Sequence, residues 1–414
     1  MLVAWGWGTR VAEATVSAAP QLLTARAELS ALADKARAAG RLALDTEFVW
    51  ERTYRPTLGV VQVATDDACA ILDATALPDL APLFPLLRDR SIPVVLHGGG
   101  QDLEILALLM GEPVRGVVDT QVEAAFLGYG LQVGLSVLLE RVLKVRIRKD
   151  QTYTDWTRRP LRPEQLAYAR ADVVHLLALH DRLRADLERR GRLGWVEEEL
   201  RRLEDAARYQ AMPDDERFRT VKGWQRLEPG ELAVLRELAA WREQAARRAN
   251  IRPNFIANDV VLVTLASRSV DNVEELRGVR GLSAGTVDRH GRAIVAAIRK
   301  GHECPRERWP SPPERMRRQA PPSGLVALLR AAVQAVADRD ELASEVIASA
   351  RDLDALVARA TAKGSPDGAS DEPSLLQGWR RTLVGDTLLA IARGELGMRY
   401  DPARHELVTE PQRS

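Results

Sequence analysis

Apolar and polar positions follow two different patterns along this chain of 414 residues. In the first half, short apolar runs bounded by turn residues alternate with stretches of helical period, which predicts strands and helices. The predicted strands cover residues 41–48, 58–64, 68–73, 93–97 and 117–119. The predicted helices cover residues 28–39, 80–88, 102–111, 120–127, 136–143 and 163–190. This order is typical of a mixed α/β sheet with helices on its faces.

After residue 190 the pattern becomes helical throughout, which predicts all-α domains behind the α/β domain. Helices are predicted at residues 231–248, 259–267, 273–276 and 283–300, and in a last region, 324–397, with a loop at 363–373. Residues 212–225 and the Pro- and Arg-rich residues 304–322 read as linkers. We expect residues 1–20 to be a poorly ordered extension. They are not expected to be a signal peptide, because Arg10 and Glu13 interrupt the apolar core that a signal peptide needs.

Composition narrows the classes of protein that fit. The hydrophobic fraction of 46% and the charged fraction of 28% are those of a globular protein, and the net charge is only +1. Cys69 and Cys304 are too few for a disulfide framework or a zinc cluster, and no third ligand stands near His175 and His180. No apolar run is long enough to span a membrane. We expect a cytoplasmic protein.

Asp45 and Glu47 lie two residues apart at the end of the first predicted strand. A strand has a period of two, so both carboxylates point to one face, where they repel unless a cation lies between them. Hard oxygen ligands suit Mg²⁺ or Mn²⁺. The spacing alone favours a strand that runs into a solvated acidic turn over a metal site.

Two further carboxylates accompany this pair. Asp102 follows His97-Gly-Gly-Gly-Gln at the start of a predicted helix, where a carboxylate is also favoured by the helix dipole alone. Tyr168 and Asp172 are four residues apart, which places them one turn apart on one helix face. Each signal taken singly is also typical of an ordinary surface residue.

The order of these segments resembles the ribonuclease D family, which belongs to the DEDD exonuclease superfamily in its tyrosine subtype. The three motifs are Asp45-Thr-Glu47-Phe with Arg52-Thr-Tyr-Arg-Pro56; His97-Gly-Gly-Gly-Gln-Asp102; and Asp155-Trp156, Arg159-Pro-Leu161 and Tyr168-Ala-Arg-Ala-Asp172. The resemblance implies a ribonuclease-H-like α/β domain followed by helical HRDC-type domains. It predicts an extension at 1–21, an exonuclease domain at 22–211, an HRDC domain at 226–303 and a second HRDC-like domain at 323–402.

The resemblance further implies a 3′→5′ exoribonuclease that releases nucleoside 5′-monophosphates from the 3′ ends of small structured RNAs such as tRNA precursors. Asp45, Glu47, Asp102 and Asp172 would hold two Mg²⁺ or Mn²⁺ ions about 3.5–4 Å apart. Asp45 would bridge the ions, and Tyr168 would orient the attacking water. The chain would act as a monomer. Two alternatives remain: a 3′→5′ DNA exonuclease of repair or proofreading type, and a non-catalytic RNA-binding scaffold.

Several neighbouring residues are expected to be structural. Asp119 ends a predicted strand, and Thr120 with Glu123 forms the pattern of a capping box. We expect a satisfied core imidazole at His97 and a solvated carboxylate at Glu104. Trp156 and Phe48 are expected to pack in the core, and Gly98–Gly100 to let a nucleotide backbone approach.

Residues 226–300 contain thirteen Lys or Arg against nine Asp or Glu, a net charge of +4. Arg247, Arg248 and Arg252 lie around the end of one predicted helix. This region is therefore predicted to grip nucleic acid through local groups, although a protein-binding module would have a similar balance.

Overall fold

The computed structural model describes residues 21–147, 154–268, 270–311, 322–361 and 372–412. The predicted extension at residues 1–20 and most of the predicted loop at 363–373 lie outside this part of the chain. Contacts divide the chain into two units, one of which combines residues 48–57 with residues 210–320. Among the described helices, none is both long and apolar enough to cross a membrane.

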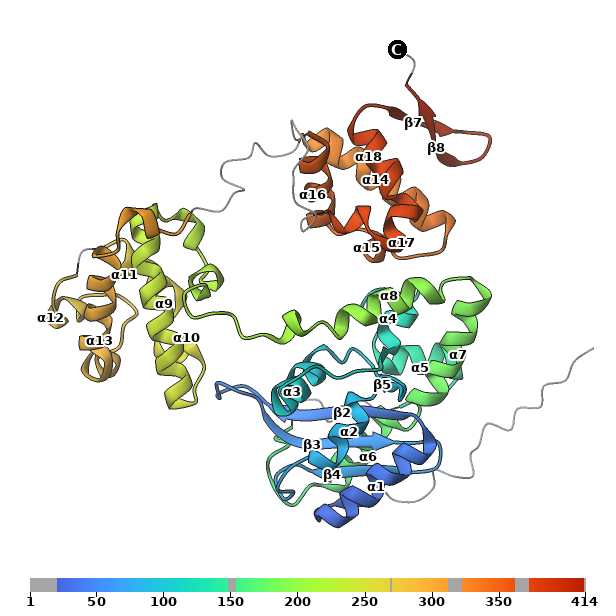
Figure 1. Cartoon of the computed structure of the whole chain (residues 1–414), viewed down its shortest axis with the longest axis horizontal. Helices are drawn as coiled ribbons and strands as arrows, with labels where there is room; N and C mark the ends of the chain where they lie inside the picture. Colours follow the sequence, from blue (N-terminus) through green and yellow to red (C-terminus); the bar gives the residue numbers. More distant parts are fainter. Residues whose placement is uncertain (1–20, 148–153, 269, 312–321, 362–371, 413–414) are drawn as a thin grey trace, which may run out of the picture. The chain divides into compact units, whose positions relative to one another are not determined.

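A six-stranded sheet forms the centre of the first unit, in the order β1-β4-β3-β2-β5-β6 (Figure 1). Its strands are β1 (Gln21–Leu23), β2 (Leu42–Val49), β3 (Thr57–Ala64), β4 (Cys69–Asp73), β5 (Val94–Leu96) and β6 (Val117–Asp119). Strand β3 is antiparallel to β4, whereas β1–β4, β2–β5 and β5–β6 are parallel pairs. The prediction of a mixed sheet is confirmed, and the sequence pattern missed only the short strand β1.

Three helices cover one face of this sheet: α1 (Arg26–Ala39), α2 (Phe84–Arg88) and α3 (Gly100–Met110). Leu29, Leu86 and Leu106 from these helices share one buried cluster with Leu44 and Val63 of the sheet. Helices α1 and α3 both end where the sequence predicts, at glycines with positive φ, Gly40 at 69° and Gly111 at 75°.

The opposite face is covered by α4 (Thr120–Ala125), α5 (Leu135–Leu143), α6 (Pro163–Val173) and α7 (Leu176–Arg189). Val60 and Ile71 of the sheet pack against Trp156 and Ala169 on this face. Trp156 is 1% exposed, so its predicted place in the core is confirmed. This face therefore lies directly under α6, the helix that carries Tyr168 and Asp172.

The single helix predicted at residues 163–190 is wrong, because the chain bends at Val174 and His175 between α6 and α7. The two halves bury their apolar sides against different neighbours. Ala169 of α6 packs on Val60 and Ile71 of β3 and β4, whereas Leu183 of α7 lies in a cluster with residues of α4, α5 and β5. A continuous 3.6-residue period cannot reveal such a change of partner.

The predicted capping box at Thr120 is also wrong. Helix α4 is capped one residue earlier by Asp119, whose carboxylate accepts a hydrogen bond from the Gln121 N–H at 2.8 Å. The Thr120 hydroxyl instead donates to the Leu96 carbonyl at 3.0 Å. Glu123 faces inward and bonds to His180 at 2.9 Å.

The second unit is helical, with α9 (Pro229–Ala249), α10 (Pro253–Ile256), α11 (Asp259–Ala266), α12 (Val273–Leu276) and α13 (Ala284–His302). The predicted linker at residues 212–225 contributes Phe218, Val221 and Trp224 to the buried core of this unit, so the linker prediction is wrong there. Three apolar side chains within seven residues are too many for a solvated linker.

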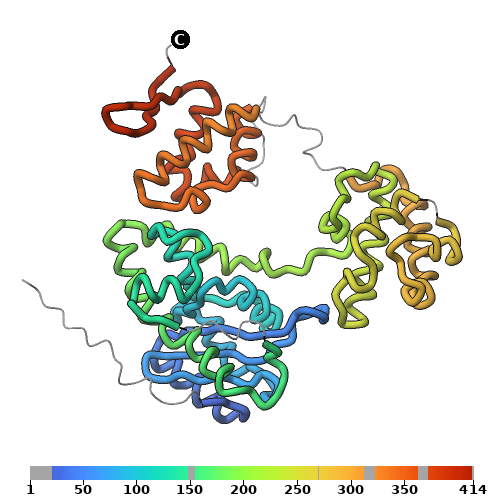
Figure 2. The backbone as a smooth tube through the Cα atoms, turned by 180° about the vertical axis from the view of Figure 1, so that it is seen from behind, coloured from blue at the N-terminus to red at the C-terminus, as the bar shows by residue number. Residues whose placement is uncertain are grey.

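The C-terminal part contains α14 (Ser323–Arg339), α15 (Ser344–Ile347), α16 (Ala350–Thr361), α17 (Gly378–Arg380) and α18 (Asp386–Ala392). It ends in an antiparallel hairpin of β7 (Leu396–Asp401) and β8 (Glu406–Pro411), which begins where the predicted helical region ends and was not predicted (Figure 2). Trp379 anchors this part to α8 (Leu193–Leu203): its ring stacks on Trp195 at 5.3 Å, and its Nε1–H donates to Glu199 at 2.9 Å.

Candidate active site

Strand β2 and helix α6 bring together the carboxylates that the sequence singled out. Asp45 and Glu47 project from one face of β2, and Asp172 projects from α6, which covers that face. Carboxylate oxygens of these three residues all lie within 4.8 Å of one another. Residues far apart in the sequence therefore form one oxygen-rich cluster.

Burial and mutual repulsion oppose the ionisation of these carboxylates. Burial raises the pKa of Asp45 well above its usual range, and the neighbouring charges of Asp102, Asp172 and Glu47 raise it further. The pKa of Glu47 is raised to about 8, mainly by burial and to a smaller extent by the charges of Asp172 and Asp102. A divalent cation would favour the ionised forms that burial and mutual repulsion oppose.

Asp102 reaches this cluster from the other side of β2. It is 8% exposed and lies in the first turn of α3. The hydroxyl of Thr46 donates a hydrogen bond to it. Burial raises the pKa of Asp102, and this hydrogen bond opposes the rise. Thr46 lies between Asp45 and Glu47 in sequence, so it points to the opposite face of the strand and can fix the fourth carboxylate there.

The turn before α3 explains how Asp102 reaches Thr46. Strand β5 is the parallel neighbour of β2, with Val95 opposite Ala43, so the turn that follows Leu96 lies beside the middle of β2, where Asp45 and Thr46 stand. Asp119 accepts hydrogen bonds from the N–H groups of Gly98 at 2.9 Å and Gly99 at 3.0 Å. Gly98 has a φ of 64°, which favours glycine. These contacts agree with the structural role predicted for Asp119.

Two other predictions for this region agree with the observed contacts. Both ring nitrogens of His97 are hydrogen-bonded, Nδ1 to the Thr120 hydroxyl at 2.9 Å and Nε2 to the Val133 carbonyl at 3.0 Å. Glu104 is exposed. Neither side chain is therefore placed like a member of the carboxylate cluster.

Tyr168 lies on α6 one turn before Asp172, as the four-residue spacing predicts. Its ring lies 6.0 Å from that of Trp156. The segment that contains Trp156 is anchored by Arg159, whose guanidinium donates to the buried carboxylate of Asp73 at 2.5 and 2.6 Å. The Tyr168 ring therefore packs against the Trp156 segment between α6 and the sheet.

The donor set fits a divalent cation. It offers several carboxylate oxygens at close range, and oxygen ligands are those that Mg²⁺ and Mn²⁺ prefer. Among the described residues, the three-carboxylate cluster of Asp45, Glu47 and Asp172 is a group able to hold such an ion. Asp102 lies outside that tight set of three but is close enough to raise the pKa of Asp45 and Glu47.

Thr46 and Arg159 both stand inside the quoted motifs, but sequence reasoning assigned neither of them a role in supporting the site. Their contacts link segments distant in the sequence, which the motifs alone do not reveal. The alternation of β2 does show that Thr46 faces away from Asp45 and Glu47, which was the available signal.

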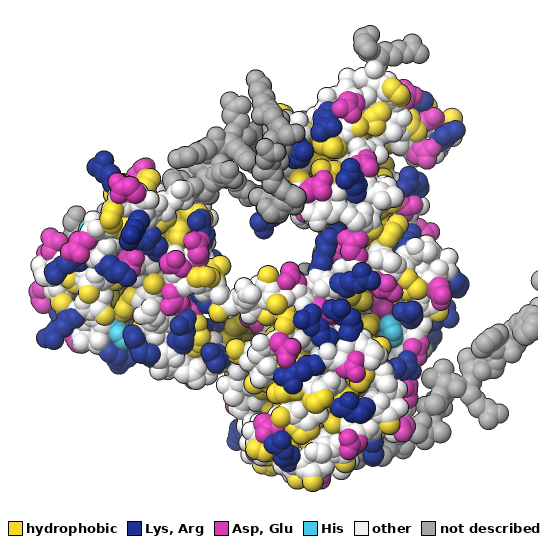
Figure 3. Space-filling model, in the orientation of Figure 1, with side chains coloured by type: hydrophobic (Ala, Val, Ile, Leu, Met, Phe, Trp, Pro, Cys, Tyr) yellow, Lys and Arg dark blue, Asp and Glu magenta, His cyan; other side chains and the backbone are white. Residues whose placement is uncertain are grey.

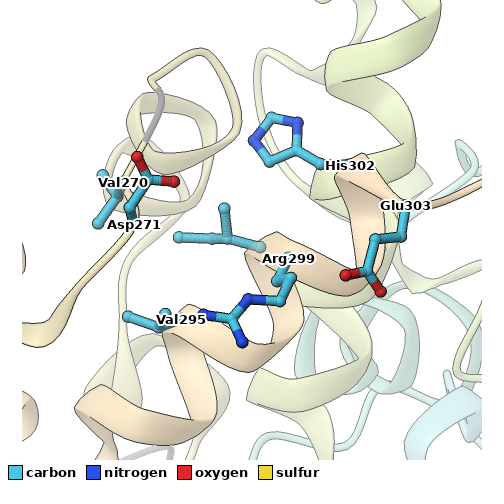
Figure 4. Close-up of a pocket in the computed structure, with 7 residues that line it drawn as sticks. Val270, Asp271, Val295, Arg299, His302 and Glu303 are labelled. Carbon is cyan, nitrogen blue, oxygen red and sulfur yellow. The ribbon is translucent and has the colours of Figure 1, made fainter.

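A separate cavity of ≈ 330 Å³ lies in the second unit, between α13 and the segment before α12. Asp271, Arg299, His302 and Glu303 line it with apolar side chains (Figure 4). Its acidic and basic groups are mixed, so it does not resemble the carboxylate cluster.

Comparison with known proteins extends the likeness over nearly the whole chain. A 3′-5′ exonuclease family model matches residues 20–188, an HRDC domain model residues 231–298, and the ribonuclease D C-terminal HRDC model residues 324–388. The chain is 37% identical over 398 residues to ribonuclease D of Granulibacter bethesdensis, covering 94% of this chain and 97% of that protein.

Ribonuclease D of Escherichia coli K12 is 31% identical over 368 residues, covering 89% of this chain and 97% of that protein. The crystal structure of E. coli RNase D, described as an exoribonuclease involved in structured RNA processing, superposes with a TM-score of 0.81 at 30% identity. The superposition covers 90% of this chain and 98% of that one. The chain therefore belongs to the ribonuclease D family of 3′→5′ exoribonucleases.

Proposed function

We propose that Asp45, Glu47, Asp102 and Asp172 hold two divalent cations, Mg²⁺ or Mn²⁺, at the site of phosphodiester hydrolysis. The observation that supports this most is the set of carboxylate oxygens of Asp45, Glu47 and Asp172 within 4.8 Å of one another. When bound, such a pair of ions activates a water molecule and neutralises the leaving 3′-oxygen of an in-line displacement at phosphorus.

Asp45 takes the central place in this proposal. Asp102, Asp172 and Glu47 all act on its pKa, which supports a position shared between the two ions. Glu47 and Asp172 would hold the ion on the side of the attacking water, and Asp102 would act on the other. Thr46 would keep the Asp102 carboxylate oriented through its hydroxyl.

Tyr168 orients the attacking water in this proposal. A phenol with an ordinary pKa of about 10 is a poor base at neutral pH, so positioning fits better than proton abstraction. Tyr168→Phe should therefore lower kcat and leave metal affinity unchanged. Equal losses of metal affinity and kcat would assign Tyr168 a structural role instead.

The proposed substrates are 3′ ends of small structured RNAs such as tRNA precursors, and the products are nucleoside 5′-monophosphates. The support is the E. coli relative, whose structure is described as acting in structured RNA processing. The carboxylates themselves do not read a 2′-hydroxyl, so a DNA exonuclease is the alternative to be tested. Digestion of matched RNA and DNA oligonucleotides separates the two, and equal or faster digestion of DNA would overturn the RNA assignment.

A variant test addresses the catalytic assignment directly. Asp45→Asn and Asp172→Asn should abolish hydrolysis of a 3′-tailed RNA while circular dichroism shows an unchanged fold, because each removes an ionised oxygen from the shared cluster. Activity should disappear with EDTA and return with Mn²⁺. A folded Asp45→Asn protein that hydrolyses RNA at the wild-type rate would refute the two-metal assignment. A wild type that hydrolyses no RNA, with or without added Mn²⁺, would favour a non-catalytic scaffold.

The second unit would grip the RNA through a small basic and aromatic surface, which we define as Trp50, Arg52, Arg55, Arg248, Arg252 and Phe255. Basic and acidic side chains are mixed over the face of this unit seen in Figure 3, so affinity must rest on local groups. Arg252 lies over the Trp50 ring at 5.7 Å, and Phe255 is 61% exposed. Exposed aromatic rings beside arginines are suited to stacking bases and binding phosphates.

Arg247 was predicted as part of this grip, but its guanidinium pairs with Asp214 at 2.9 Å and lies over Tyr54. Arg252→Ala should weaken RNA binding and lower its salt dependence, because a phosphate contact is lost. Arg277 belongs to the same unit but pairs with Asp288 at 2.7 Å, so Arg277→Ala is the matched control and should change neither. If Arg252→Ala and Arg277→Ala change RNA affinity and its salt dependence equally, this surface is not the RNA-binding site.

We further propose that the protein is a monomer in the cytoplasm. Both cysteines, Cys69 and Cys304, are free thiols, which supports a reducing compartment. Light scattering coupled to size-exclusion chromatography tests the monomer, and a mass of two or more chains would refute it.

A further inference from the structure

Gln62 lies in the middle of β3 and is fully buried, with 0% exposure. Neither its Nε2 nor its Oε1 has a hydrogen-bond partner among the residues that the structure describes. Gln165 provides a contrast: it is also buried, yet its Oε1 accepts from the Arg162 N–H at 3.0 Å. An amide buried without partners costs stability, so a buried strand position with this side chain calls for an explanation.

The sheet places Gln62 on the catalytic face. Its register partner on β4 is Ile71, which packs with Val60 and Trp156 beneath α6. Ala43 of β2 packs with residues of α6 and α7 on the same face, and Asp45 follows two residues later with the same orientation. Gln62 and Asp45 therefore share one face of two neighbouring strands.

The two residues also lie at nearly the same level along the strands. β2 ends at Val49, four residues beyond Asp45, and β3 begins at Thr57, five residues before Gln62. Residues opposite one another on neighbouring strands have Cβ atoms about 4.5–5.5 Å apart, and diagonal neighbours about 7–8 Å. A glutamine side chain spans either separation, so its amide can reach the Asp45 carboxylate.

Asp45 is also an acceptor suited to this amide. Its carboxylate is surrounded by other acids, so it gains from any group that donates a hydrogen bond to its ionised form. A bound cation would fix that ionised form in place. Residues that hydrogen-bond to a metal-ligating carboxylate orient it and strengthen metal binding.

We propose that Gln62 is a positioning residue whose Nε2–H donates to the Asp45 carboxylate when that carboxylate holds a divalent cation. The inference rests on the proposed metal-binding role of Asp45. It assigns a function to the buried amide that neither the fold nor the packing of β3 requires, since Val60 and Ala64, its neighbours on the same face of β3, are buried and apolar.

Gln62→Met tests this inference, because methionine has a similar length and no amide. In the metal-free protein the variant should be as stable as the wild type or more stable, since no protein hydrogen bond is lost. Its affinity for Mn²⁺, measured by calorimetry on the full chain, should fall about 10–100-fold. Gln165→Met is the control for the first measurement and should lower the melting temperature, because its amide is bonded.

The outcomes separate this inference from the proposed function. If the wild type binds Mn²⁺ and Gln62→Met binds it equally well, the positioning role is overturned while the metal site stands. If Gln62→Met destabilises the metal-free protein as much as Gln165→Met does, the amide is bonded without metal and the inference is again overturned. If the wild type binds no divalent cation, the proposed function itself fails.

Discussion

Glu47 allows the electrostatics of the site to be tested without measuring catalysis. Burial, followed by the charges of Asp172 and Asp102, raises its pKa from 4.5 to about 8 in the metal-free protein. Between these two pH values the folded state keeps a proton that the unfolded state has lost, so the free energy of unfolding falls as the pH rises. One pKa unit corresponds to about 1.36 kcal/mol, so the difference between 4.5 and about 8 sets an upper limit of about 5 kcal/mol.

Glu47→Gln removes the titrating group and keeps the shape of the side chain. The metal-free variant should lose less stability than the wild type between about pH 5 and pH 8. Near pH 8 it should be the more stable protein, by up to several kcal/mol. The free energy of unfolding of Glu47→Gln should still fall somewhat as the pH rises, because burial also raises the pKa of Asp45 and Asp102.

Urea denaturation of the metal-free proteins, followed by circular dichroism at several pH values, measures this difference. Glu104→Gln is the matched control, because Glu104 is exposed and should leave the pH dependence unchanged. Adding Mg²⁺ should stabilise the wild type more than Glu47→Gln, since a ligand that binds only the folded state raises its stability. Parallel pH profiles for the wild type and Glu47→Gln would show that Glu47 titrates normally, and the reasoning would be refuted.

Three further predictions concern the supports of the site. Thr46→Val should lower metal affinity about 10–100-fold in calorimetry with an unchanged circular dichroism spectrum, because Asp102 loses the hydroxyl that orients it. Burial raises the pKa of Asp73, but hydrogen bonds from Arg159 and Thr75 outweigh it and leave the pKa at about 2. The ionised Asp73 carboxylate therefore stabilises the fold above about pH 4, and this stabilisation is lost toward pH 2. Between these pH values the free energy of unfolding of Asp73→Asn should fall by about 2 kcal/mol less than that of the wild type, as measured by acid denaturation. Trp379→Ala should cost about 3–5 kcal/mol in denaturant unfolding, because a buried aromatic ring is removed; a loss below about 1 kcal/mol would contradict its anchoring role.

Local patterns in the sequence were sufficient for most of the exonuclease fold. The strand that bears Asp45 and Glu47 is bounded by turn residues and has a clear apolar run, and α1 and α3 end at glycines that favour the left-handed conformation. Asp172 could be placed one turn after Tyr168 because helix geometry fixes that relation. Spacing alone could not predict that residues of β2 and α6 lie close together, whereas the resemblance of the three motifs to the family did predict it.

The failures share a different physical cause, which is tertiary contact. The bend at Val174 and His175 depends on which neighbours α6 and α7 meet, and these lie elsewhere in the chain. Glu123 left its predicted capping role because His180, on α7, offers it a buried partner. The C-terminal hairpin at Leu396–Asp401 and Glu406–Pro411 is mostly exposed and has no strong alternation to reveal it.

A single tripeptide of β2 explains how the site is assembled from segments so distant in the sequence. Asp45 and Glu47 point to the face covered by α6, where they meet Asp172, whereas Thr46 points to the other face, where it binds Asp102. The same alternation that gives a strand two faces thus joins carboxylates from a strand and two helices. The cost of that arrangement is visible in the raised pKa values of Asp45, Glu47 and Asp102. A cation that lowered these pKa values would strengthen the fold and complete the site in one event, so variants of this tripeptide that bind metal more weakly should gain less stability when metal is added.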